Sequence, residues 1–144
     1  MKKTLFIVLI VLICNSTLLF SQPNDIEQDI CEGSGVFEAN VDIPDIGNSL
    51  FQYSFTCSKT SNENHNGILI FVGGGFIVVE KFYWYVEPEN NEMTINTFER
   101  TIRVDGEEER ENIDETDIYS VRHRNFFGVR TLYLNEGSYQ YVED

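Results

Sequence analysis

The sequence predicts an all-β protein: an antiparallel meander that closes into a small barrel or a sandwich, with a short N-terminal helix at most. After Gly35 the chain alternates between stretches rich in β-branched and aromatic residues and short stretches of turn residues. Beyond Cys31, no stretch repeats apolar residues at helical spacing. Without a helix long enough for a crossover, consecutive strands are expected to run antiparallel.

Length and composition indicate one folded domain. The chain has 144 residues, of which 42% are hydrophobic and 13% aromatic, too apolar for a disordered chain and too short for two domains. We divide it into a signal peptide at residues 1–21, an N-terminal segment with a short helix at residues 22–35, and a single β domain at residues 36–144.

The N-terminus has the pattern of a bacterial secretory signal. Lys2 and Lys3 precede an apolar run that extends to Phe20, and Ser21 is a small residue ahead of polar sequence. We therefore expect export from a bacterial cell, to the periplasm, the cell surface or the medium. The alternative is an uncleaved membrane anchor, for which residues 15–17 interrupt the apolar run.

The charge balance narrows the class of partner. The formal net charge is −14, and loss of the two signal lysines would leave eight basic residues against twenty-four acidic ones, a net charge of −16. Such a surface repels nucleic acid and anionic membranes, so we expect no nucleic-acid partner and no membrane association after signal cleavage. It suits a cationic partner, or simply keeps an exported protein soluble.

The cysteines predict one disulfide. Cys14 lies in the signal, where Ile13 replaces the small residue that lipid attachment at Cys14 would require. Cys31 and Cys57 remain, and an even pair in an exported domain indicates a Cys31–Cys57 bond worth roughly 3 kcal/mol. Two unpaired buried thiols are the alternative.

A short helix is expected at residues 25–31. Ile26 and Ile30 share one face, and Gly33 and Gly35 end the segment. So short a helix is not stable alone in water, so it must pack on the β domain or fray.

Eight strands follow from the pattern of apolar and turn residues. They are expected at residues 36–42, 49–57, 67–72, 76–87, 93–104, 117–123, 129–135 and 138–142. Gly73-Gly74-Gly75 lacks the lysine and hydroxyl residue of a phosphate-binding loop, so we interpret it as a turn between two strands.

One hairpin is predicted at residue level, around the turn Asp105-Gly106. The register would make the acidic run after Gly106 a strand held by cross-strand ion pairs. The expected pairs are Val104 with Glu107, Arg103 with Glu108, Arg100 with Glu111, and Phe98 with Ile113.

An aromatic cluster at residues 82–85 divides between two faces. Alternation places Phe82 and Trp84 on one face and Tyr83 and Tyr85 on the other. We expect Trp84 in the core; the alternative is an exposed strip suited to stacking on sugars or peptides.

No constellation for catalysis or metal binding can be assembled from the sequence. His65 and His123 lack any metal-binding motif, and no serine or cysteine stands in a nucleophile setting. Asp114, Glu115 and Asp117 are interpreted as a solvated acidic loop, with calcium binding as the alternative. We therefore expect a non-enzymatic protein without metal or cofactor; a hydrolase with an unidentified carboxylate pair is a minor alternative.

From Ile68 onward the order of features resembles the small lipocalin-like, calycin-type barrels of exported bacterial proteins. The resemblance covers about half of the chain after the signal, and it would imply binding of a small apolar ligand. It is carried by Leu69-Ile70-Phe71, Gly73-Gly74-Gly75, Tyr83-Trp84-Tyr85, Glu89-Asn90-Asn91, Met93-Thr94-Ile95 and Arg130-Thr131-Leu132-Tyr133-Leu134.

The predicted docking site is the loop from residue 122 to residue 130. Arg122, Arg124 and Arg130 form a basic concentration on an acidic chain, and they flank Phe126 and Phe127. Arginine and aromatic residues are enriched where proteins bind one another. We predict an exported binding or surface-interaction module for an unknown protein partner, with a lipocalin-like carrier of a small apolar ligand as the alternative.

Overall fold

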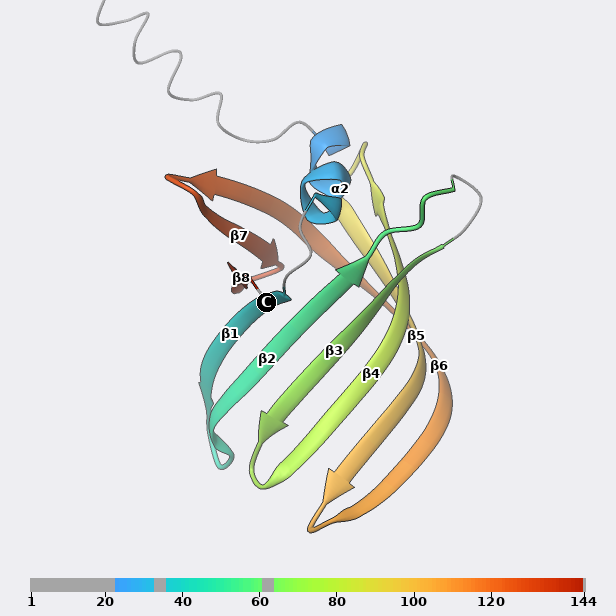
Figure 1. The fold of residues 1–144 in the computed structure, drawn as a ribbon, viewed down its shortest axis with the longest axis vertical. Helices are drawn as coiled ribbons and strands as arrows, with labels where there is room; N and C mark the ends of the chain where they lie inside the picture. The colour runs from blue at the N-terminus through green and yellow to red at the C-terminus, as the bar shows by residue number, and fades with distance from the viewer. Residues whose placement is uncertain (1–22, 33–35, 61–63, 144) are drawn as a thin grey trace, which may run out of the picture.

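The computed structural model describes residues 23–32, 36–60 and 64–143, which form an eight-stranded antiparallel closed barrel with a helix at one end (Figure 1). The elements are α2 (Pro23–Cys31), β1 (Val36–Ile43), β2 (Gly47–Thr56), β3 (His65–Gly73), β4 (Phe76–Glu87), β5 (Glu92–Val104), β6 (Glu107–Phe126), β7 (Val129–Leu134) and β8 (Gly137–Val142). The predicted all-β class is confirmed, as a barrel. The predicted signal, Cys14 included, lies outside the described residues. None of the described helices has the length and apolarity to cross a membrane.

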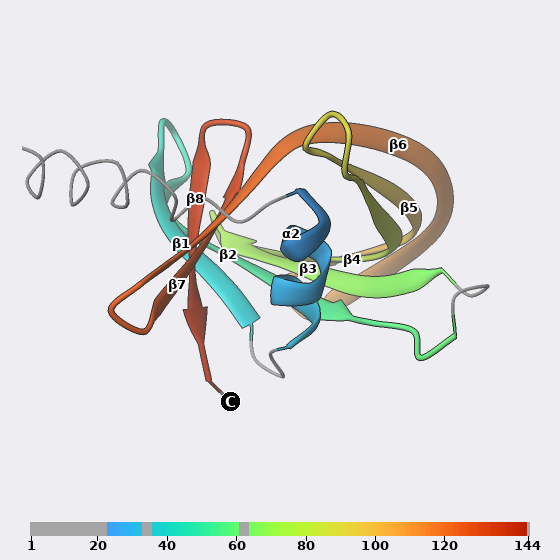
Figure 2. The ribbon, with the colours of Figure 1, turned by 90° about the horizontal axis from the view of Figure 1, so that it is seen from above.

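Each strand pairs with the next along the chain, and β8 returns to β1. This seam consists of three pairs, Val36 with Val142, Phe37 with Tyr141, and Glu38 with Gln140. Seen from above, α2 lies across one end of the barrel (Figure 2), where it contacts β2, β4 and β6.

The strands differ greatly in length, and the barrel is therefore complete only in the half beneath α2. β6 has 20 residues whereas β7 and β8 have six each. Among the described residues, β7 pairs with residues 121–126 of β6 but with no earlier part of that strand, and residues 107–119 of β6 pair only with β5. Residues 39–43 of β1 likewise pair only with β2. We call the half of the barrel away from α2 the open half, because residues 39–43 of β1 and 107–119 of β6 each have a paired neighbour on one side only.

The core fills the half beneath the helix. Ile26 and Ile30 of α2 are 3% and 2% exposed, so the predicted apolar face of the helix packs on the barrel end. Trp84 is 1% exposed whereas Tyr85 points outward, which confirms the predicted division of the aromatic cluster. The other buried apolar side chains are Phe37, Tyr53, Phe55, Phe82, Val86, Met93, Ile95, Val121, Leu132 and Leu134.

The predicted turns at Asp105-Gly106 and at the triple glycine are confirmed. Asp105 and Gly106 both have positive φ, of 51° and 86°, as the tight turn between β5 and β6 requires. The register pairs Arg103 with Glu108 and Arg100 with Glu111, as predicted. Gly74 and Gly75 form the corresponding turn between β3 and β4.

The predicted pairing of Phe98 with Ile113 is wrong, because the ladders around β5 are irregular at Phe98. The register on both sides of β5 shifts there. Phe98 stacks on outward-pointing Tyr83, with ring centroids 4.6 Å apart, instead of facing Ile113. A bulge inserts one residue and reverses which side chains point inward along the strand.

The acidic segment after Gly106 is not interrupted by a loop. The structure continues β6 from Glu107 to Phe126, so the predicted loop containing Asp114, Glu115 and Asp117 is wrong. Pairing with β5 outweighs the poor strand propensity of acidic residues. Alternation places Asp114 on the face opposite to Glu115 and Asp117, so the three carboxylates do not converge.

The predicted disulfide is confirmed. Cys31 at the end of α2 bonds to Cys57 directly after β2, with the two Cα atoms 5.6 Å apart. The bond ties the helix to the rim of the barrel.

Candidate functional site

The turn between β6 and β7 presents aromatic side chains to solvent. Phe127 and Gly128 form a two-residue turn with positive φ of 50° and 82°. A left-handed conformation is unfavourable for a bulky residue, and it projects Phe127 until its side chain is 92% exposed. Phe126 and Val129 beside it are each about half exposed.

Two arginines extend this apolar tip along the outer face of β6. The guanidinium of Arg124 lies 4.8 Å from the ring centroid of Phe126, and that of Arg122 lies 5.2 Å from the ring of Tyr133. A small pocket of about 190 Å³ lies between Arg122, Arg124 and Tyr133. We call the exposed set Arg122, Arg124, Phe126, Phe127 and Val129 the hairpin patch.

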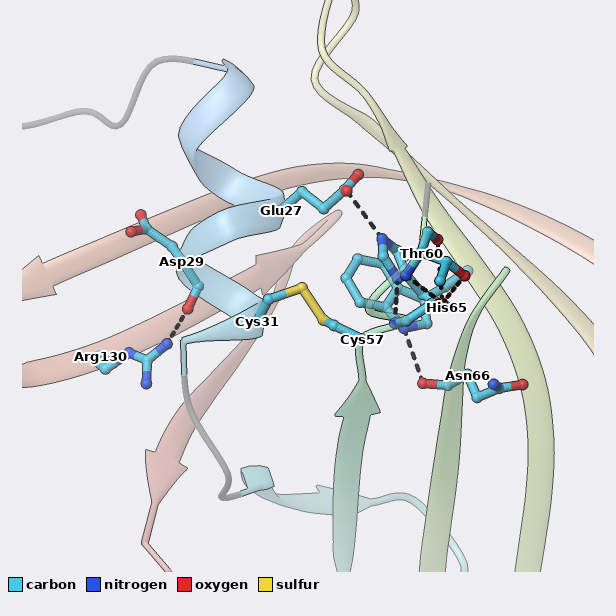
Figure 3. Close-up of a disulfide and its surroundings, with 10 residues drawn as sticks. Glu27, Asp29, Cys31, Cys57, Thr60, His65, Asn66 and Arg130 are labelled. Carbon is cyan, nitrogen blue, oxygen red and sulfur yellow. Dashed lines mark hydrogen bonds and ion pairs between the residues drawn. A yellow bond between two sulfur atoms is a disulfide. The ribbon is translucent and has the colours of Figure 1, made fainter. Parts of the chain in front are cut away.

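Arg130 does not belong to this patch, although the sequence places it nearby. Its guanidinium donates a hydrogen bond to the backbone carbonyl of Asp29 in α2 (Figure 3). It also lies 4.4 Å from the ring centroid of Tyr141. Arg130 therefore holds the helix on the barrel end, and only four of the five predicted docking residues lie together on the surface.

A buried histidine makes the second polar link to the helix. His123 is 3% exposed, and its Nδ1 lies 2.9 Å from a carboxylate oxygen of Asp29. Burial lowers the pKa of His123, and Arg130 lowers it further against the opposing effect of Asp29. Nε2 has no hydrogen-bond partner in the described part of the chain, so no nucleophile accompanies this Asp–His pair there.

This lowered pKa predicts a loss of stability in mild acid. Below the ordinary histidine value of 6.5, the unfolded chain takes up a proton that folded His123 resists, so the free energy of unfolding falls as the pH drops. Urea unfolding at about pH 7.5 and 5.5 measures the effect, and we expect His123→Asn to weaken the pH dependence. The pKa of Glu99 is also lowered, by hydrogen bonds from Lys81 and Arg110. The stability that Glu99 provides is therefore lost only as the pH falls through about 4.5, below the two pH values compared. Equal pH dependence in the two proteins would refute the assignment.

A pocket of about 420 Å³ lies at the rim beside the disulfide. His65 lines this pocket, and its Nδ1 accepts a hydrogen bond from the backbone N–H of Ser58. Its Nε2 lies 2.9 Å from the Glu27 carboxylate of α2 (Figure 3). The ring of His65 also packs on Trp84, with centroids 4.7 Å apart, and the Trp84 indole donates to the carbonyl of Asn66. Both nitrogens of His65 are thus used to hold the rim together.

A polar layer separates the core from the open half. Arg100 lies 2.7 Å from a carboxylate oxygen of both Glu80 and Glu115, and these hydrogen bonds raise the pKa of its guanidinium. The rings of Tyr53 and Tyr139 meet edge-on there, with centroids 5.1 Å apart, and burial raises the pKa of both phenols. The two tyrosines lie between the apolar core and the charged cluster of Arg100, Glu80 and Glu115.

Four residues of the hairpin patch are among those that the sequence predicts for docking, whereas no sequence pattern predicts the polar links to the helix. Asp29 and His123 are 94 residues apart, and no local pattern marks the pair. In the described residues, no three His, Cys, Asp or Glu side chains are grouped as a metal site. Comparison of the chain with protein-family models, curated proteins and solved structures finds no match.

Proposed function

We propose that this protein is an exported, non-enzymatic interaction module that docks on a protein partner through the hairpin patch. The observation that carries the proposal is Phe127, 92% exposed at the tip of a two-residue turn. Its neighbours Phe126 and Val129 continue the apolar surface, and Arg124 adds a positive charge. The chemistry fits a partner with an apolar pocket bordered by carboxylates.

Export is supported by the disulfide, which is stable in an oxidising compartment. A role other than small-molecule transport is supported by the filled core: Trp84, Phe37 and Phe82 occupy the barrel beneath α2, each at 2% exposure or less. A carrier would need several hundred cubic ångströms of empty apolar space there. Native mass spectrometry of the purified protein tests this point, and a retained apolar molecule would favour the carrier alternative.

Replacing Arg124, Phe126 and Phe127 together with alanine is expected to abolish docking while leaving the melting temperature unchanged. The three side chains are exposed, so their loss uncovers no core. Interface anchors of this kind are worth at least about 2 kcal/mol each, or roughly thirtyfold in affinity per anchor, so the loss of all three should leave no measurable binding. A photo-crosslinker at position 127 in the exporting host identifies the partner, and titration with that purified partner measures the affinity.

Tyr85→Ala is the matched control, since Tyr85 is an aromatic residue 45% exposed on the outer face of β4. It should bind the partner as the wild type does, and a crosslinker at position 85 should capture nothing. A fall of many degrees in the melting temperature of the triple variant would make the hairpin patch structural and refute the proposal.

A further inference from the structure

The open half of the barrel has a long strand edge without a partner. Residues 107–119 of β6 pair with β5 on one side, and no other described strand pairs with them on the far side. The backbone N–H and C=O groups along a free edge can pair with another extended chain. This edge is thus a surface on which a further strand can add to the sheet.

The inner face of this edge strand is acidic. Val121 and His123 are buried, so alternation places the odd-numbered residues of β6 on the inner face. Glu107, Glu109 and Asp117 belong to that face; they are exposed and form no ion pair within the described chain. Glu111 and Glu115, also inner, share the single guanidinium of Arg100 with Glu80.

The inner face of β2 to β5 in the open half is apolar and partly exposed, and we call it the apolar floor. Phe51, Phe71 and Phe76 lie on the inner face of β2, β3 and β4, with ring centroids 4.8 and 5.4 Å apart between successive rings. Val104, on the same face of β5, is 45% exposed. A pocket of about 160 Å³ lies where Ile102 and Val104 meet residues 107–109.

We propose that the free edge of β6 binds an extended, basic peptide segment of a partner by strand addition. Main-chain hydrogen bonds to residues 107–119 would provide the pairing. Inward side chains of the added strand would lie opposite Glu107, Glu109 and Asp117, where lysine or arginine is favoured. The aliphatic stems of such residues would cover the apolar floor while their charged ends meet the carboxylates.

Charge identifies the occupant. A second copy of this chain would bring another acidic β6 edge against this one, and like charges directly opposite destabilise a strand pair. An uncharged apolar molecule would leave the carboxylates of the inner face without a counter-charge. The surface differs from the hairpin patch in position and in sign, and the proposal does not depend on docking there.

The probe is a synthetic ten-residue peptide of alternating lysine and valine, titrated into the full protein by calorimetry at about 0.15 M salt. We expect saturable binding, and none for the glutamate–valine peptide of the same length. Two further peptides carry N-methyl groups on all lysine amides or on all valine amides. In an added strand only one of these sets faces β6, so one methylated peptide should bind and the other should not.

Variants locate the site. Glu107→Gln, Glu109→Gln and Asp117→Asn combined should weaken binding by about tenfold, because each removes an inward charge opposite the added strand. Glu89→Gln, Glu136→Gln and Glu143→Gln form the matched control, with the same loss of charge at exposed positions outside residues 107–119. All six side chains are exposed, so both variants should melt as the wild type does.

Three results would overturn the proposal. They are absence of binding by the lysine–valine peptide, equal binding of the two methylated peptides, and equal weakening in the two triple variants. The last two would indicate general attraction of a cation to an acidic protein. Hydrogen exchange adds a direct readout, since the bound peptide should slow exchange of amides within residues 107–119 and leave the hairpin patch unchanged.

Discussion

The Trp84→Ala variant should lose about 3–5 kcal/mol of unfolding free energy, the largest effect expected for a single side chain in this barrel. Trp84 is 1% exposed and its ring meets Phe55 edge-on at 5.1 Å. Its indole N–H also donates a hydrogen bond to the backbone carbonyl of Asn66. Alanine would leave a cavity in the core and remove this hydrogen bond.

Urea unfolding at neutral pH measures the loss. Tyr85→Ala, on the same strand but pointing outward, is the control and should cost less than about 1 kcal/mol. If Trp84→Ala unfolds at nearly the wild-type urea concentration, the tryptophan is not the centre of the core.

Removing the disulfide is expected to have the second largest effect. The bond closes a loop between residues 26 positions apart, for which the chain-entropy relation gives about 3.5 kcal/mol. The double variant Cys31→Ala, Cys57→Ala should therefore unfold at a markedly lower urea concentration. Because α2 has only nine residues, the helix should also separate from the barrel more often.

Hydrogen exchange and limited proteolysis distinguish this local opening from global unfolding. Residues 26–31 should lose protection first, whereas β4 and β5 keep theirs. Reduction of the wild-type protein should reproduce the result for the double variant. Equal protection of α2 with and without the bond would show that Asp29, His123 and Arg130 suffice to hold it.

The all-β class and the disulfide could be predicted because their signals are local or follow from counting, whereas the choice between barrel and sandwich came from the structure. Strand residues alternate between turns that carry Gly, Asn or Asp, and Asp105-Gly106 fixed the β5–β6 register over the first pairs. Cys31 and Cys57 are the only cysteines outside the predicted signal. The sequence also predicts that Phe126 and Phe127 lie close together at a turn, because both belong to one turn signal.

The remaining features depend on contacts that no window of sequence contains. The bulge at Phe98 reverses the inward face of β5, so the partner of Ile113 could not be read from alternation. The polar attachment of α2 joins Asp29 to His123 across most of the chain. Acidic residues have poor strand propensity, so the continuous β6 emerged only from its pairing with β5.

The β1–β8 seam has a consequence for how the chain folds. Seven of the eight strand pairings join sequence neighbours and can form as separate hairpins, whereas the seam joins residue 36 to residue 142. Closing so long a loop costs chain entropy that only three residue pairs offset directly, so the seam should form late. Small β-barrels fold in roughly milliseconds to seconds. Until the seam forms, β1 and β8 remain available to pair with another chain, and the rate of ring closure therefore sets how long the nascent protein is exposed to misassembly.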